Sequence, residues 1–201
     1  MRGVRHKVST RLEAWLLGTR SELPPAVSAQ LKKGLFFSVP IFMGGVINTI
    51  AVAAVAAWLY PSALFIGWLA FEIALGFVRV SVVALGRRTI ATNREPPYLL
   101  AGLLSCAWAA SVGFGTVAAL LTEHWILAII ACLSAAGMVC GACLRNYGTP
   151  RLAATMGLLI LAPCAVAAAF TSESLLVMIS IQPPVYMLTV FSASFSLNRM
   201  M

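Results

Sequence analysis

An acid and a base stand seven residues apart inside one long apolar segment. Glu72 and Arg79 lie in the run from Ser62 to Leu85, which is long enough to cross a bilayer because a helical span needs about 20 apolar residues. A charged side chain at the bilayer centre costs about 2.5–3.5 kcal/mol even on the mildest scale, so it needs a protein or water partner. Because seven residues make nearly two helical turns, both side chains are expected on one face that looks into a helix bundle.

This pair has two interpretations. It is a signal, ligand or proton site, because intramembrane acids are functional candidates by default, or it is a structural clamp that orients helices. Asn48 and Gln182, in other apolar runs, are further candidates for the polar interior, and Asn48 is the expected partner of Glu72. Arg79 is near enough to the end of its run to snorkel towards the membrane surface, which predicts that Glu72 is the lonelier charge.

The remaining elements must be helices that hold this pair in a membrane. The 201 residues are 61% hydrophobic and only 10% charged, which is typical of integral membrane proteins. We expect an all-α integral membrane protein, a six-transmembrane-helix bundle made of three helical hairpins. Residues 1–34 are predicted to be a cytoplasmic basic tail with an interfacial helix, and residues 35–199 the membrane domain. The predicted spans are 35–59, 62–85, 98–121, 125–144, 152–170 and 175–197.

Positive charges gather in every second loop. The net charge of +8 would suggest nucleic acid for a soluble protein, but here it predicts an orientation, because cytoplasmic loops collect Lys and Arg. Outside the spans, the basic residues are Arg2, Arg5, Lys7, Arg11, Arg20, Lys32 and Lys33 in the tail, Arg87, Arg88, Arg94, Arg145 and Arg151 in inner loops, and Arg199 after the last span. We therefore expect a multi-pass protein of a bacterial inner membrane with both termini in the cytoplasm, and no nucleic-acid partner.

Cysteine and histidine offer little redox or metal chemistry. Cys140 and Cys143 have the spacing of a thiol redox motif, but they lie at the cytoplasmic end of their span without a second pair, and we interpret them as packing residues. A membrane thiol or quinone oxidoreductase is thus the third functional interpretation. The two histidines, His6 and His124, lie outside the spans. No metal site, cofactor or catalytic residue is expected.

Prolines and glycines mark two further features. Pro163 in the fifth span and Pro183-Pro184 in the sixth remove helix hydrogen bonds and are expected to kink their helices. Two kinks in successive helices predict a hinge or a small cavity. The Gly137-x-x-x-Gly141 motif permits close packing against a helix of the same chain or of a partner.

The inner loop before the fifth span carries a recognisable pattern, Arg145-Asn146-Tyr147-Gly148-Thr149-Pro150-Arg151. With the proline-containing span, short outer turn and last span that follow, it resembles the MASE-type membrane sensors that precede the GGDEF domain of bacterial diguanylate cyclases. The resemblance covers about residues 30–199. Arg145, Asn146, Pro150 and Arg151 match the Arg-Asn and Pro-Arg of the family's cytoplasmic loop, which implies a coupling loop, a homodimer and a cytoplasmic GGDEF output domain.

The catalytic part of such a cyclase is missing from this sequence. The chain stops at Met201, without a G-G-[DE]-[DE]-F signature or a carboxylate cluster for Mg²⁺. The expected function is therefore a non-catalytic sensory and dimerisation module in cyclic di-GMP signalling, either excised from a longer cyclase or a stand-alone relative. The alternative is a small transporter or channel subunit, which kinked helices and a central acid fit, although inverted repeats are missing.

Overall fold

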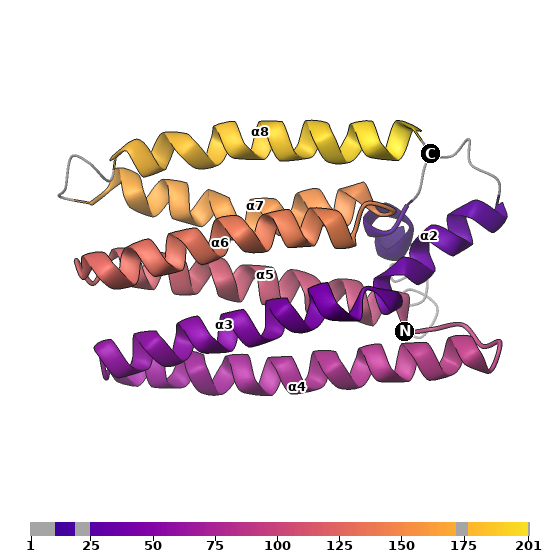
Figure 1. Cartoon of the computed structure of the whole chain (residues 1–201), viewed down its shortest axis with the longest axis horizontal. Coiled ribbons are helices and arrows are strands. Elements are labelled where there is room, and N and C mark those ends of the chain that lie inside the picture. The colour runs from indigo at the N-terminus through magenta and orange to yellow at the C-terminus, as the bar shows by residue number, and fades with distance from the viewer. Residues whose placement is uncertain (1–10, 19–24, 172–176, 201) are drawn as a thin grey trace.

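In the computed structural model, which describes residues 11–18, 25–171 and 177–200, long helices lie side by side in one bundle (Figure 1). The predicted all-α class is confirmed, because these described residues contain no strand. The helices are α2 (Pro25–Phe37), α3 (Val39–Leu59), α4 (Ala63–Ala91), α5 (Tyr98–Leu120), α6 (Trp125–Arg145), α7 (Pro150–Ala169) and α8 (Val177–Met200).

Five of these helices, α3 to α7, are long and apolar enough to cross a membrane. Large apolar side chains such as Ile47, Phe77 and Leu133 are exposed on the outside of the bundle, where only lipid or a partner chain would keep them from water. The helices therefore indicate a multi-pass membrane protein.

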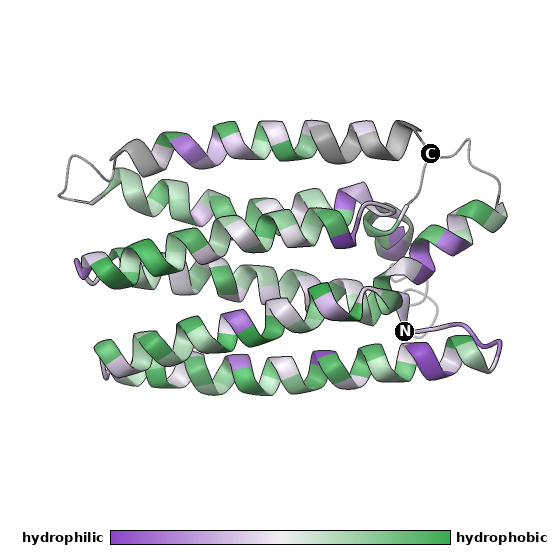
Figure 2. Ribbon diagram, viewed as in Figure 1, coloured by the Kyte–Doolittle hydropathy of each residue, from purple (hydrophilic) through white to green (hydrophobic). Residues whose placement is uncertain are grey.

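The two ends of the bundle differ in polarity. Hydrophilic residues gather at the end where α2, the last turn of α4 and the α6–α7 connection lie (Figure 2). At the other end, Trp58, Tyr60 and Trp125 are exposed, and Trp and Tyr are enriched at membrane interfaces. The structure thus brings the basic loops together at one end, which we call the basic end.

The long apolar helix that corresponds to the predicted first span begins at Val39, four residues after the expected start at about Leu35. Helix α2 ends at Phe37, and α3 begins at Val39 with Pro40 in its first turn. Proline has no backbone N–H and a fixed φ, so it suits a helix start and interrupts a helix that would otherwise continue. Leu35 and Phe36 are buried, and the Phe36 ring lies against Gly86 near the end of α4. Helix α2 is therefore a packed element at the basic end.

Part of the predicted tail also packs against the bundle. Residues 11–16 are helical, and Leu16 and Leu17 are buried next to Gly102 of α5, while Leu12 and Trp15 remain exposed. The interfacial position of this segment stays a prediction. The first ten residues of the tail and the predicted start of the sixth span at residue 175 lie outside the described residues.

Helix α7 packs against three other helices, most extensively against α5 and α8 and also against α6. A Cβ at Gly113 of α5 would lie 2.2 Å from the carbonyl oxygen of Leu159, so the two backbones touch there. Consecutive helices from α3 to α8 pack as well, and the arrangement as three hairpins stays a prediction. Helix α7 continues through Pro163, and α8 through Pro183 and Pro184, so the prolines do not end these helices.

Candidate functional site

Helix α4 turns one face to the bundle, and both of its central charges lie on that face. The buried residues of α4 recur every three or four positions from Phe65 to Gly86, which is the period of an amphipathic helix. Glu72 is only 2% exposed and Arg79 only 5%. The sequence spacing therefore placed the two charges correctly on one inward face.

Glu72 is held by a short chain of hydrogen bonds from α4 to α5. The Ser111 hydroxyl of α5 donates to Oε1 of Glu72, and Nε1 of Trp68 donates to Oγ of Ser111 at 3.1 Å. The Trp68 ring fits beside α5 because Gly115 has no side chain, a Cβ at that position lying 2.0 Å from the ring. The carboxyl group thus has a polar partner from another helix.

Asn48 is not that partner, so the expected pairing of Glu72 with Asn48 is wrong. Its Nδ2 donates instead to Oγ of Ser134 on α6 at 2.6 Å. Asn48 therefore joins α3 to α6 by an interhelical hydrogen bond, the usual work of a polar residue within a membrane bundle.

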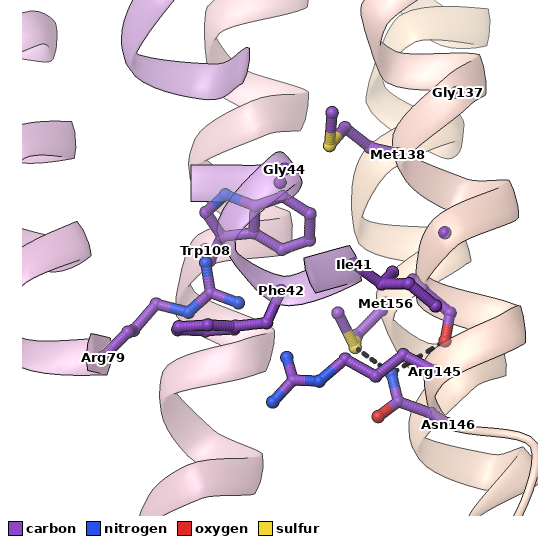
Figure 3. A pocket seen from close by; sticks show the side chains of 13 residues that line it. Ile41, Phe42, Gly44, Arg79, Trp108, Gly137, Met138, Arg145, Asn146 and Met156 are labelled. Atoms are coloured by element: carbon purple, nitrogen blue, oxygen red, sulfur yellow. Dashed lines mark hydrogen bonds between the residues drawn. The ribbon is translucent and has the colours of Figure 1, made fainter. Parts of the chain in front are cut away.

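Arg79 lies between two aromatic rings (Figure 3). Its Cζ is 4.5 Å from the ring centroid of Trp108 and 5.0 Å from that of Phe42. Trp108 is fixed in turn, because its Nε1 donates to Oγ1 of Thr49 at 2.9 Å. Within the described parts of the chain, Arg79 makes neither a hydrogen bond nor an ion pair.

The expected snorkelling of Arg79 is therefore wrong, and the physical reason lies in the length of α4. From Arg79 the helix continues to Ala91, about three more turns, so the guanidinium is far from the end of its helix. The rings of α3 and α5 enclose it. Arg79, and not Glu72, is the charged side chain that has no hydrogen-bonding partner among the described residues.

Arg145 lies on the other side of Phe42, with its Cζ 4.6 Å from the ring centroid (Figure 3). It is 7% exposed. One Nη2–H donates to the carbonyl oxygen of Leu35 at 2.7 Å, while Nε has no partner among the described residues. This arginine ends α6 and links it to the last residues of α2.

Asn146 is the C-cap of α6 and is 1% exposed. Its Nδ2 donates to the carbonyl oxygen of Ala142 at 2.8 Å and to Sδ of Met156 at 3.4 Å. Its Oδ1 accepts no hydrogen bond from the described residues. Of the predicted coupling loop, Arg145 and Asn146 thus belong to the buried site.

The other two residues of that loop lie outside the site. Pro150 begins α7, and Arg151 is exposed. Nη1 of Arg151 donates to the carbonyl oxygen of Trp15 at 3.4 Å, which connects the start of α7 to the N-terminal helical segment.

A cavity of about 190 Å³ lies among these groups. Arg79, Arg145 and Asn146 supply its polar wall, and Trp108 and Met156 line it as well. Cation–π contacts are worth about 2 kcal/mol when desolvated, whereas burying a charge costs several kcal/mol. The aromatic rings therefore offset only part of the cost of two buried guanidinium groups.

Gln182 and the prolines of α8 belong to a different place. Gln182 is exposed and lines, with Pro183, a mostly apolar cavity of about 490 Å³ between α6, α7 and α8. It does not belong to the group formed by Glu72, Arg79, Trp108, Ser111, Arg145 and Asn146, which we call the buried polar centre. Pro163 lies inside α7 and outside both cavities.

The cysteines are free thiols where the structure describes them. Cys140 is exposed and Cys143 is buried, and the sulfur atoms of Cys132 and Cys164 are 3.8 Å apart. Across the described residues no group of three or more His, Cys, Asp or Glu side chains could hold a metal ion.

Sequence reasoning missed the aromatic residues of the site. Trp68 precedes Glu72 by four residues and Trp108 precedes Ser111 by three, so helical spacing places each tryptophan on the face of its polar neighbour. The positions of the two tryptophans could therefore have been predicted from the sequence. The contact of Phe42 with both arginines could not be predicted, because it depends on how α3, α4 and α6 meet.

No family model matches this chain, and no curated protein and no solved structure matches it either. Fold and site together define a class, a helical multi-pass membrane protein with a buried cationic cavity near the basic end of its bundle.

Proposed function

We propose that the chain is a six-span sensory and dimerisation module of a bacterial inner membrane that regulates a cytoplasmic diguanylate cyclase domain and is itself non-catalytic. In this proposal α8 is the sixth span, and the spans form three hairpins. Both termini lie in the cytoplasm with the basic end. Two copies of the chain associate, and the last helix carries the signal to the output domain.

The observation that carries this proposal is the path of contacts from the buried cavity to α8. Asn146 contacts Met156 of α7, and one residue further along α7, a Cβ at Gly157 would lie 2.8 Å from the ring of Phe191 on α8. The hydroxyl of Tyr186 on α8 donates to the carbonyl oxygen of Ala136 on α6 at 3.1 Å. A change in the cavity wall therefore has a packed route to the last helix.

Such a route supports a population shift. A stimulus can move a two-state equilibrium only if it interacts differently with the two packings, and packed helices shift between discrete arrangements. Arg145 reaches α2 and Asn146 reaches α7, so these two neighbours join both sides of the cavity. This arrangement supports, for Arg145 and Asn146, the role of a coupling loop that the resemblance to MASE-type sensors implies. For Pro150 and Arg151 that role rests on the resemblance alone.

The proposed orientation predicts the behaviour of topology reporters. Fusions at Glu123 and Glu173 should be active only for a reporter that needs the periplasm, because the loops around them contain no Lys or Arg. Fusions at Asn93 and Tyr147, in the basic loops, serve as matched controls and should show the opposite activity. Cytoplasmic reporter activity at Glu123 or Glu173 would contradict the six-span arrangement.

The function itself is tested by joining the chain to an output domain. Fused in frame after Met201 to a bare GGDEF domain, the chain should raise the rate of cyclic di-GMP synthesis above that of the bare domain, because a cyclase must bring two GTP-loaded domains together. The purified chain should be a dimer by mass photometry in nanodiscs and should consume no GTP. A strictly monomeric chain whose fusion has only the bare domain's activity would favour the transporter alternative.

A further inference from the structure

The cavity between α3 and α6 contains hydrogen-bonding capacity that the described residues leave unused. Arg79 donates no hydrogen bond to them, and Nε of Arg145 has no partner. Both side chains are more than nine-tenths buried. Buried polar groups are normally paired, and buried charges are normally neutralised, so these two donor groups indicate a ligand with acceptor atoms.

The positive charge of the cavity indicates that its ligand is negatively charged. Arg79 and Arg145 both line it, and neither forms a direct ion pair with an acidic side chain of the described residues, although the Glu72 carboxyl group acts on Arg79 electrostatically at longer range. Glu72, the acid nearest along α4, is bound by Ser111. An anion would neutralise guanidinium charge in a medium where charge-assisted hydrogen bonds are strong.

The size and the apolar wall of the cavity indicate that the ligand also has a small apolar body. A dry cavity of about 150 Å³ holds benzene, so about 190 Å³ has room for one ring and a carboxylate. Trp108, Met138 and Met156 line it together with glycines. An inorganic anion would leave this apolar wall without a partner.

The cavity also has a side opening towards the outside of the bundle. Gly44 of α3 and Gly137 of α6 both line it and are exposed, and a Cβ at either position would meet no atom within 4 Å. These glycines therefore leave a gap between the two helices. Such a gap would admit an amphipathic molecule from the bilayer.

We propose that the cavity bounded by Arg79, Arg145 and Asn146 binds a small amphipathic carboxylate that enters between α3 and α6. The carboxylate lies beside the guanidinium groups, and its apolar or aromatic body lies along Trp108 and the methionines. This ligand class supplies the stimulus for the proposed sensory function and rests on it for its biological role. Binding itself is a property of the chain alone.

The probe for this site is 4-fluorobenzoate, followed by ¹⁹F NMR on the full chain in nanodiscs, with empty nanodiscs as the blank. We expect saturable binding of 4-fluorobenzoate and none of neutral 4-fluorobenzamide. Arg79→Met and Arg145→Gln should each weaken binding by about tenfold or more, the effect of one charge-assisted hydrogen bond. Arg88→Gln, which removes an exposed charge from the same bundle end, should leave binding unchanged.

Thermal unfolding of the same variants separates a ligand site from a structural clamp. Keeping a charge buried costs several kcal/mol, so Arg79→Met, which removes such a charge, should hold or raise the Tm of the empty protein while binding is lost. A lowered Tm with unchanged binding would overturn the proposal. Equal binding of the benzamide, or competition by inorganic phosphate at equal concentration, would overturn the carboxylate assignment.

A second pair of variants leaves every charge in place. Gly137→Leu should narrow the side opening and weaken binding, whereas Gly67→Leu, at another exposed helical glycine whose Cβ meets no atom within 4 Å, should not. Equal binding by both variants would overturn entry between α3 and α6. Because no output domain takes part in these measurements, a failure here leaves the cyclase fusion as an independent test of the proposed function.

Discussion

Trp108→Ala is expected to cause the largest loss of stability of any single truncation in the polar centre. The indole is buried, stacks on the Arg79 guanidinium at 4.5 Å and donates to Thr49 at 2.9 Å. Truncating a buried tryptophan to alanine typically costs about 3–5 kcal/mol. Here the truncation also removes one of the two rings that enclose Arg79, so we expect the upper part of that range.

Two companion variants divide this effect into its parts. Trp108→Phe keeps a ring over Arg79 and loses the hydrogen bond to Thr49, which should cost about 1–3 kcal/mol. Trp58→Ala removes an 81% exposed tryptophan near the C-terminal end of α3, away from the basic end. It should change stability by only about 0.5 kcal/mol. Reversible unfolding in detergent measures all three. Equal losses for Trp108→Ala and Trp58→Ala would show that Trp108 does not hold the centre together.

Glu72→Lys is the second change with a large expected effect. It adds a third cation to an interior that already holds Arg79 and Arg145, and it removes the acid that acts on Arg79 electrostatically. An uncompensated buried charge costs about 3–5 kcal/mol. The ammonium also cannot accept the hydrogen bond that Ser111 donates to Glu72. We expect little folded protein to reach the membrane, measured as detergent-extracted monodisperse material.

The neutral variants at the same position test the hydrogen bond alone. Glu72→Gln retains an acceptor for Ser111 and should cost about 1 kcal/mol or less, whereas Glu72→Leu removes the acceptor and should cost about 1–3 kcal/mol. Similar stability of Glu72→Lys and Glu72→Gln would mean that position 72 faces water and not the packed interior of the bundle.

Local helix periodicity explains what could be predicted from the sequence. The alternation of apolar runs and basic loops predicted the helices, and the seven-residue spacing predicted that Glu72 and Arg79 share an inward face, because both signals lie within one element. Pro40 was also visible in the sequence, yet the apolar run around it hid the break between α2 and α3. The hydrophobic composition of a run does not show where within it a new helix begins.

The partners across helices could not be predicted in the same way. Both α3 and α5 pack against this part of α4, since Gly76 lies against Val46 and Ile50 of α3. Yet Glu72 accepts from Ser111 of α5, while Asn48 donates to Ser134 of α6. Arg145 was expected in a loop, but α6 continues to that residue and turns its side chain into the bundle. Which helix faces which is a property of the packed bundle, and no local pattern in this sequence encodes it.

The central claim, that the buried polar centre sets the output of a sensory module, is tested most directly by the rate of cyclic di-GMP synthesis in the GGDEF fusion. Glu72→Gln should change that rate by about fivefold, the shift that roughly 1 kcal/mol of bias produces. Pro183→Ala with Pro184→Ala lies in α8, outside the polar centre, and should change the rate by a similar factor because α8 carries the signal to the output domain in this proposal. Arg88→Gln, an exposed charge at the end of α4, should leave the rate unchanged. Identical rates for the unsubstituted fusion and all of these variants, with every chain folded in the membrane, would contradict the claim.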